Sequence, residues 1–371
     1  MIKITLPALV LLCCFGCHAA SAAEQYYSAD DFYRVSKIDT HMHLHSTGPA
    51  FMAEAEHDHF RVLTINVDYA DFPALAEQNR IAQTLQREHP AALAFATTFS
   101  VQNFEQPGWA EGVIRDIDAA VAHGAVAVKV WKNIGMELRA SDGRLVMVDD
   151  PHFKPVFDHL EKMHIPLLGH QGEPKNCWLP LSQMTIKGDG EYFTSHPQYY
   201  MYLHPEMPGY DDQIRARDNM LVQHPGLQFV GMHLASLEWS VDELGKFLDR
   251  FPSAMVDMAA RIGQLQAQSN LDRDRVRNFL IRYQDRILYA TDLDQEPDCT
   301  RDCADQVPFA EQAREVWLRD WRYFTSSGLI TVPDLEQPVQ GLRLPKSVID
   351  KIYGRNAERL FPTAWKRNSG G

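Results

Sequence analysis

The sequence lacks the motifs that define several large enzyme classes. It contains no G-x-G-x-x-G turn, no P-loop, no G-x-S-x-G and no H-E-x-x-H. These patterns build dinucleotide sites, nucleotide phosphate sites, serine nucleophiles and zinc protease sites, respectively. A dehydrogenase, a nucleotidase, a serine hydrolase or a zincin would therefore be without its defining residues.

Positive charge is also scarce. The 371 residues include 36 Lys and Arg against 49 Asp and Glu, which gives a formal net charge of -13. No basic run is longer than the pair in "WKR". Because nucleic-acid binding depends on clustered Lys and Arg, this balance argues against a nucleic-acid partner.

Only one apolar run stands out near the start, in "MIKITLPALVLLCCFGCHAASAAEQ", and it is too short for a membrane span. It lies between Lys3 and a small-residue A-x-A cleavage pattern at 20–22. We therefore expect residues 1–22 to be a signal peptide, residues 23–371 to form one domain, and the protein to be secreted or periplasmic. A lipoprotein acylated at Cys17 is the weaker alternative, because Cys14 stands three positions before it.

Cysteine is sparse beyond this leader, where only Cys177, Cys299 and Cys303 remain. Three cysteines make no disulfide framework. Cys299 and Cys303, in "CTRDC", would pair in an oxidising compartment or stay as two free thiols, and the sequence leaves both alternatives open.

Short apolar or β-branched runs alternate with helical patterns along the rest of the chain. The strand-like runs are Lys37–His43, Arg61–Asp68, Ala91–Ser100, Ala125–Trp131, Ile165–Gly169, Leu227–His233, Ala254–Met258 and Arg286–Asp292. Eight strands alternating with helices predict parallel βαβ units and a (β/α)₈ TIM barrel. A doubly wound sheet is the alternative, but it usually needs the Gly-rich first turn that is missing here.

Two long loops and a tail interrupt this pattern. The loops run from Glu173 to about Tyr210 and from roughly Asp294 to Pro308, each after a strand end, where barrels build substrate sites. The tail from Ile330 holds one helical piece, which we expect to pack under the barrel. The first loop is rich in aromatic and imidazole side chains, either as a lid over a ring-shaped substrate or as packing of the loop on itself: Trp178, Tyr192, Phe193, Tyr199, Tyr200, Tyr202 and His204.

The first strand carries an H-x-H pair, His41 and His43, in "KIDTHMHLH". Alternate residues of a strand share a face, so Asp39, His41 and His43 are predicted to point the same way, and two such imidazoles can hold one ion. His45 lies past the strand, where "STGP" predicts a loop, and is not expected to bind metal. A second H-x-H in "EHDHF" has no strand beneath it and precedes the second strand, at the wrong end of a barrel.

Three later strands also end on polar residues. The runs "IPLLGH", "LQFVGMH" and "RILYATD" close on His170, His233 and Asp292. Barrel active sites assemble at these strand ends, and His and Asp are common metal ligands. Four histidines and an aspartate at four strand ends therefore predict a metal site.

The fourth strand, "AVAVKVW", carries a lysine in an apolar run. If the β-branched Val126, Val128 and Val130 face the helices, then Lys129 points into the barrel. A buried ammonium is costly and needs a partner: an interior carboxylate such as Asp39 or Asp257, a substrate anion, or chemical modification.

Together, these residues resemble the amidohydrolase superfamily of metal-dependent barrels. The stretches "IDTHMH", "GAVAVKVW", "LLGHQGEP" and "YATD" are most similar to its amidohydrolase-related (amidohydrolase 2) branch, over essentially the whole mature chain. The resemblance implies one divalent ion, often zinc, held by His41, His43, His170 and Asp292. It also implies that His233 activates water or the substrate and that Asp292 moves the proton.

The resemblance leaves the number of ions open. Elsewhere in the superfamily the lysine of the fourth strand is carboxylated and bridges two ions, which would make Lys129 part of the catalytic centre. The sequence retains every residue that such a site requires.

Residues near the predicted strand ends are candidates for substrate contact. Asp257 and Arg261 share inward parity, and Arg261 could hold a carboxylate or form a surface salt bridge. Glu173 and Lys175 follow His170 and are expected to border the pocket.

The resulting prediction is a metal-dependent hydrolase of a small amide, ester or lactone. A lyase on the same site, either a decarboxylase or a hydratase, is the alternative, because this branch includes non-hydrolytic members. A further alternative is a catalytically inert barrel that binds metal. The substrate, the metal and a homo-oligomeric state are not fixed by the sequence.

Overall fold

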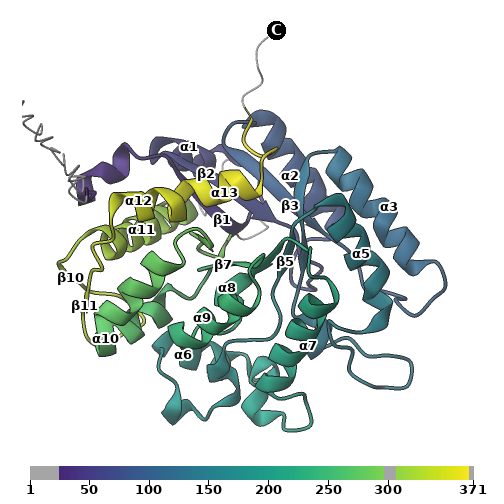
Figure 1. The fold of residues 1–371 in the computed structure, drawn as a ribbon. Coiled ribbons are helices and arrows are strands. Elements are labelled where there is room, and N and C mark those ends of the chain that lie inside the picture. Colours follow the sequence, from purple (N-terminus) through teal and green to yellow (C-terminus); the bar gives the residue numbers. More distant parts are fainter. Residues whose placement is uncertain (1–24, 296–305, 367–371) are drawn as a thin grey trace, which may run out of the picture.

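A curled parallel sheet surrounded by helices forms the centre of the molecule (Figure 1). The computed structural model describes residues 25–295 and 306–366. The first predicted strand is present with its predicted bounds, the other predicted strands are shorter than predicted, and the TIM-barrel prediction is confirmed. The strands of the sheet are β1 Lys37–His43, β2 Phe60–Ile65, β3 Leu93–Thr98, β4 Ala125–Val130, β5 Leu167–Gly169, β6 Phe229–Gly231, β7 Met255–Asp257, β8 Ile287–Leu288 and β9 Leu293–Asp294.

The eighth predicted strand, Arg286–Asp292, forms only the short strand β8, and a further strand, β9, begins directly after it. β8 pairs with β7, whereas β9 pairs with β1 through the register Met42↔Leu293. Between β8 and β9, Thr40 N donates to Tyr289 O at 3.1 Å and Asp292 N donates to His41 O at 2.8 Å. The break therefore places Asp292 directly against the first strand.

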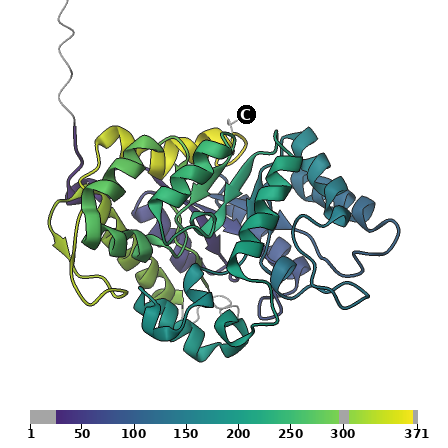
Figure 2. The ribbon, with the colours of Figure 1, turned by 60° about the horizontal axis from the view of Figure 1, so that its bottom comes forward.

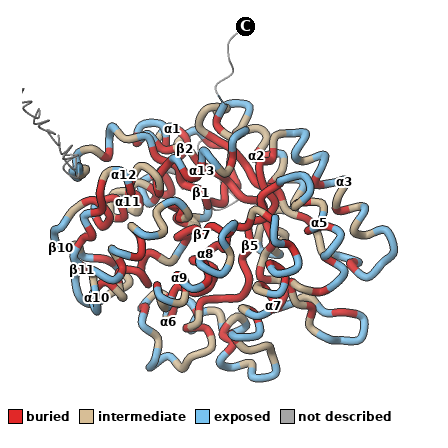
Figure 3. The backbone as a smooth tube through the Cα atoms, viewed as in Figure 1, coloured by how far each residue is buried: buried red, intermediate tan, exposed pale blue. Residues whose placement is uncertain are grey.

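Amphipathic helices cover the outside of the sheet, and Figure 3 shows the buried stretches concentrated along the strands. Helix α9 illustrates the pattern: Ser240 caps its first turn by accepting from Glu243 N, and Leu244 and Leu248 bury one face. The larger helices are α1 Pro49–His57, α2 Leu75–Glu88, α3 Trp109–Ala122, α5 Lys154–Met163, α7 Tyr210–Gln223, α9 Val241–Arg250, α10 Ile262–Arg282 and α11 Gln306–Thr325. The shorter ones are α4 Asn133–Met136, α6 Lys187–Ser195, α8 Met232–Ala235, α12 Lys346–Asp350 and α13 Asn356–Leu360.

Two strand irregularities change which face some residues occupy. In β1 the pairing with β2 shifts between Asp39 and Met42, so Asp39 turns away from the histidines and accepts from Trp317 Nε1 of α11 at 2.9 Å. The prediction that Asp39 shares a face with His41 was therefore wrong, because a bulge reverses the alternation.

A similar shift affects β4. The register moves from Phe95↔Ala125 to Thr97↔Val128, and Val126 joins the interior cluster rather than the helix-facing one. Val128 and Val130 do pack on the helix side, as predicted. Lys129 lies inside the barrel, 1% exposed.

The long segment after β5 packs largely on itself. Phe193 and Tyr200 stack against each other and form a small core with Cys177 and Met201, whereas Tyr202 is exposed. This favours self-packing over a lid for most of its aromatic residues. In Figure 2 the segment, with α6, forms the teal group at the lower edge, opposite the yellow C-terminal helices.

The C-terminal segment closes the other end of the barrel, as predicted. Phe361 and Trp365 belong to the interior cluster, and Trp365 Nε1 donates to Val62 O at 3.0 Å. Ahead of them, β10 (Leu329–Ile330) and β11 (Val339–Gln340) form a separate antiparallel pair.

Several predictions fall outside the described residues and stay predictions. They are the signal peptide, acylation of Cys17, and the state of Cys299 and Cys303. Within residues 25–295 and 306–366, no helix is long and apolar enough to cross a membrane.

Candidate metal centre and its cavity

The first and last strands bring two imidazoles and a carboxylate together at the C-terminal end of the barrel. His41 Nε2 lies 3.0 Å and His43 Nε2 lies 3.3 Å from the same atom, Asp292 Oδ1. One ligand atom from each of the three residues lies within 4.8 Å of the other two. This is the spacing of atoms that share one cation.

The second nitrogen of each imidazole is already engaged. His41 Nδ1 lies 3.0 Å from Asp257 Oδ2, and His43 Nδ1 lies 2.8 Å from the carbonyl oxygen of Ile65. Because a carboxylate and a carbonyl only accept, each Nδ1 carries a proton, which leaves each Nε2 able to offer a lone pair to a cation bound between it and Asp292. The donor set therefore fits a divalent cation.

His170 and His233 lie beside this group rather than in it. Their ring centroids are 4.1 Å apart, and the Nε2 atom of each is buried without a hydrogen-bond partner. His170 has no atom within the 4.8 Å grouping of His41, His43 and Asp292. Burial, and then repulsion from His233, holds the pKa of His170 well below its ordinary value, so its imidazole is neutral.

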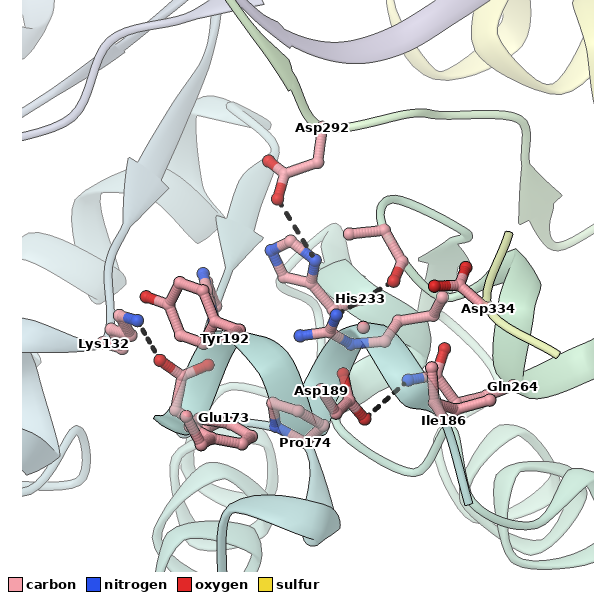
Figure 4. A pocket seen from close by; sticks show the side chains of 15 residues that line it. Lys132, Glu173, Pro174, Ile186, Asp189, Tyr192, His233, Gln264, Asp292 and Asp334 are labelled. Carbon is pink, nitrogen blue, oxygen red and sulfur yellow. Dashed lines mark hydrogen bonds and ion pairs between the residues drawn. The ribbon is translucent and has the colours of Figure 1, made fainter. Parts of the chain in front are cut away.

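The carboxylate of Asp292 is held ionised. Burial would raise its pKa, but the neighbouring imidazoles, His41 foremost, lower the pKa well below its ordinary value. Figure 4 shows Asp292 and His233 facing each other above the pocket, with His233 Nδ1 3.9 Å from Asp292 Oδ2.

Backbone outliers are concentrated at these strand ends. His233, Leu234, Ala235 and Ser236 all have positive φ, between 55° and 57°, and Asp292 has φ 67°. Such left-handed conformations are costly for residues other than glycine and persist only where the surroundings impose them. Buried Arg217 supplies part of that support, because its Nη1 donates to the carbonyl oxygen of Ala235.

Lys129 approaches the centre but makes no salt bridge with Asp39 or Asp257. Its Nζ lies 3.4 Å from His41 Nε2 and 2.7 Å from the thioether sulfur of Met232. Burial lowers the pKa of Lys129 to about 8, partly offset by Asp292 and Asp257.

A cavity of about 350 Å³ opens next to His170, His233 and Asp292. Two predicted substrate residues, Glu173 and Arg261, line it. The other two do not. Asp257 is fully buried and bonds to His41, and the ammonium of Lys175 lies 3.6 Å from the Trp239 ring centroid, outside the lining.

Sequence analysis missed part of this lining. Lys132 forms a buried ion pair with Glu173, and Asp189, Gln264 and Asp334 face them across the pocket (Figure 4). Of these, Lys132 carried a signal, because it follows the fourth strand within three residues of the inward Lys129. The other three arrive from distant segments.

Comparison with known proteins identifies the family. The pattern of the family described as "Amidohydrolase" matches residues 38–363. The chain belongs to the amidohydrolase family. The resemblance to the amidohydrolase-related branch is thereby confirmed. Members of this family are expected to be metal-dependent enzymes. No curated protein matches the sequence.

Solved structures match this amidohydrolase at low sequence identity. An uncharacterised TIM-barrel protein from Bordetella bronchiseptica matches with 13% identity and a TM-score of 0.53, covering 90% of this chain and 100% of that one. A 2,6-dihydroxybenzoate decarboxylase from Rhizobium matches with 13% identity and a TM-score of 0.47, covering 88% and 98%. A 4-oxalomesaconate hydratase from Rhodopseudomonas palustris matches with 14% identity and a TM-score of 0.43, covering 84% and 78%.

Proposed function

We propose that this amidohydrolase is a metal-dependent hydrolase of a small amide, ester or lactone. The observation that carries the proposal is the convergence of His41 Nε2 and His43 Nε2 on one oxygen of Asp292, with both Nδ1 atoms fixed from behind. A structural histidine cluster has no need to leave two lone pairs and a carboxylate aimed at one point.

The residues that would hold the ion are His41, His43 and Asp292, with His170 as the further nitrogen ligand that the family resemblance implies. When bound, a divalent cation such as zinc supplies a Lewis acid that lowers the pKa of water from 15.7 towards about 7. The neutral imidazole of His170 and the ionised Asp292 are both in the protonation state that ligation requires.

His233 is suited to holding the attacking water. Its Nδ1 lies 3.0 Å from the carbonyl oxygen of Ala259, which only accepts, so the proton is on Nδ1 and the buried Nε2 is an acceptor. Burial lowers the pKa of His233 to about 3, so the ring stays neutral at physiological pH. His233 therefore orients a water hydrogen rather than polarising a carbonyl oxygen.

Asp292 is the group that moves the proton. Its Oδ1 faces the two histidines, while its Oδ2 lies 3.9 Å from His233 Nδ1, so the carboxylate stands beside the imidazole that would hold the water. The carboxylate takes the proton of that water and returns it to the leaving group on the cavity side.

A matched pair of variants tests the proposal. His43→Ala removes a proposed ligand, whereas His45→Ala removes a buried histidine two residues on, which pairs with Asp294 instead. We expect purified protein to bind about one equivalent of zinc or a similar ion, as metal-assisted hydrolysis requires. His43→Ala should lose both the metal and turnover, and His45→Ala should keep the metal.

Full activity in metal-free protein would overturn the proposal. Product analysis over a panel of amides, esters, lactones and aromatic acids then separates hydrolysis from the lyase alternative. Release of carbon dioxide, or addition of water without cleavage, would assign the site to a lyase.

A further inference from the structure

The cavity has two chemically different sides. Lys132 and Glu173 lie on one side, and Asp189, Gln264 and Asp334 lie on the other, with His233 and Asp292 between them (Figure 4). The second group is called the acidic wall here, and it is formed by α6, α10 and the loop between β10 and β11.

Asp334 reaches the acidic wall because two glycines leave room for it. A Cβ atom added to Gly188 would lie 2.6 Å from Asp334 Oδ1, and one added to Gly263 would lie 2.8 Å from Oδ2. Within residues 25–295 and 306–366, this carboxylate accepts no hydrogen bond and forms no direct ion pair. Burial raises the pKa of Asp334, although the charges of Arg319 and Arg261 lower it. Asp334 thus lines the cavity without a direct partner.

Gln264 adds a second unmatched acceptor. Its side chain is 4% exposed, and its Nε2 donates to Asp189 Oδ2 at 3.1 Å, which leaves its Oε1 buried without a donor. Asp189 Oδ2 also accepts from Asn176 Nδ2 at 2.7 Å. The amide donors of the acidic wall are therefore used internally, while acceptors remain.

Negative charge exceeds positive charge in the lining, where the carboxylates of Glu173, Asp189, Asp292 and Asp334 stand against Lys132 and Arg261. Lys132 pairs with Glu173. Arg261 donates from Nη1 to Ala260 O, and its Nε is buried without an acceptor. Burial lowers the pKa of Arg261, but the charges of Asp189 and Glu238 raise it above its ordinary value. A substrate carboxylate placed on Arg261 would also be repelled by Asp189, Glu173 and Asp292, whose charges act on Arg261, so the charge balance disfavours that arrangement.

We propose that the acidic wall binds a positively charged nitrogen group of the substrate, an ammonium or a guanidinium, while the scissile bond lies at the metal centre. Such a group donates hydrogen bonds and accepts none, which matches the free acceptors on Asp334 and Gln264. This inference rests on the proposed function of the same cavity and defines its substrate class.

The test uses the zinc-loaded full-length protein and four probes of similar length: n-pentylammonium, n-pentylguanidinium, 1-pentanol and hexanoate. Calorimetric titration should show at least one of the two cations binding about tenfold or more tighter than the alcohol and the carboxylate, as expected for a charge-assisted hydrogen bond. Asp334→Asn should remove that preference. Glu336→Gln, which neutralises an exposed carboxylate in the same loop, should leave it unchanged.

Gly188→Ala provides a second variant in case Asp334→Asn fails to fold. The added methyl group displaces the Asp334 carboxylate without changing charge, so it should also weaken cation binding about tenfold. Equal or tighter binding of hexanoate or pentanol, or a cation preference that survives both variants, would overturn the inference.

Turnover separates this inference from the proposed function. Cation binding with no hydrolysis of amides that end in an ammonium group would reject the hydrolase and keep the acidic wall. Hydrolysis confined to substrates that end in a hydroxyl or a carboxylate would keep the hydrolase and reject the acidic wall as a cation site.

Discussion

Asp257 Oδ2 lies 3.0 Å from His41 Nδ1, and Asp257 Oδ1 accepts from the backbone nitrogen of His233 at 2.6 Å. One fully buried carboxylate thus fixes the ring of a proposed metal ligand and the backbone of the residue that would hold water. Its importance comes through these two groups, since it does not line the cavity.

Replacing Asp257 by Asn should weaken metal binding with little change in shape. The amide of Asn would donate to His41 Nδ1, which moves the ring proton to Nε2 and blocks the lone pair that faces Asp292. We expect metal affinity to fall about 10- to 100-fold, measured by competition with a chelator. Unchanged affinity with a correctly folded variant would refute this role.

Lys129 tests how many ions the centre holds. Its Nζ is covered by the sulfur of Met232, where an added carboxyl group would have to fit, so we expect an unmodified amine and one bound ion. Lys129→Met should therefore leave the metal content at about one equivalent. Intact mass and metal analysis decide the point: added carbon dioxide and two ions in the wild type, both lost in the variant, would support a bridged pair.

The Lys132–Glu173 pair should matter for folding as well as for the cavity. Glu173→Gln leaves a buried ammonium without its counter-charge, which costs roughly 3–5 kcal/mol of unfolding free energy. Denaturant unfolding measures the loss. The exposed Lys246–Glu243 pair, at 2.7 Å, is the control, and Glu243→Gln should change stability little.

Replacing both partners distinguishes lost pairing from lost packing. Lys132→Met combined with Glu173→Gln removes the uncompensated charge, so the double variant should be more stable than Glu173→Gln alone. A double variant that is less stable would show that packing dominates.

Asp320 should make stability depend on pH. Burial, together with Asp39, raises its pKa from 3.8 to about 7, so between these values the folded chain keeps a proton that the unfolded chain has lost. Its contribution to the unfolding free energy therefore falls as pH rises from about 4 to 7 and stays low above that.

Asp320→Asn removes this titration but keeps an oxygen for the hydroxyl of Tyr289, which donates to Asp320 Oδ2 at 3.0 Å. Relative to the wild type, the variant should gain a few kcal/mol at pH 8 that it does not gain at pH 4. Urea midpoints at the two pH values measure the difference. An equal shift at both would show that the carboxyl group titrates normally.

Sequence periodicity predicted the barrel and the inward Lys129 because these depend on local alternation and strand ends. His41, His43 and Asp292 could be grouped for the same reason, since strand C-termini meet at one end of a barrel. The bulges that turn Asp39 outward and Val126 inward could not be predicted, because one extra residue in a pair reverses parity without any sequence mark.

The acidic wall shows a different limit. Asp189, Gln264 and Asp334 are separated by 75 and 70 residues along the chain and belong to two helices and a hairpin loop. No periodic pattern links them, and each is an ordinary polar residue in its own segment. Only the packing of the loop after β5 and the C-terminal segment brings them to one cavity.

The break between β8 and β9 means that metal binding should also stabilise the closure of the barrel. His41 and His43 stand on one side of the seam that closes the barrel and Asp292 stands on the other, joined by the bond from Asp292 N to His41 O. An ion held by all three residues would link the two sides of that seam. Tighter metal binding would therefore raise the free energy needed to open the barrel there. Hydrogen exchange of the backbone amides of Asp292 and Leu293 should therefore slow more on metal loading than that of any other part of the barrel.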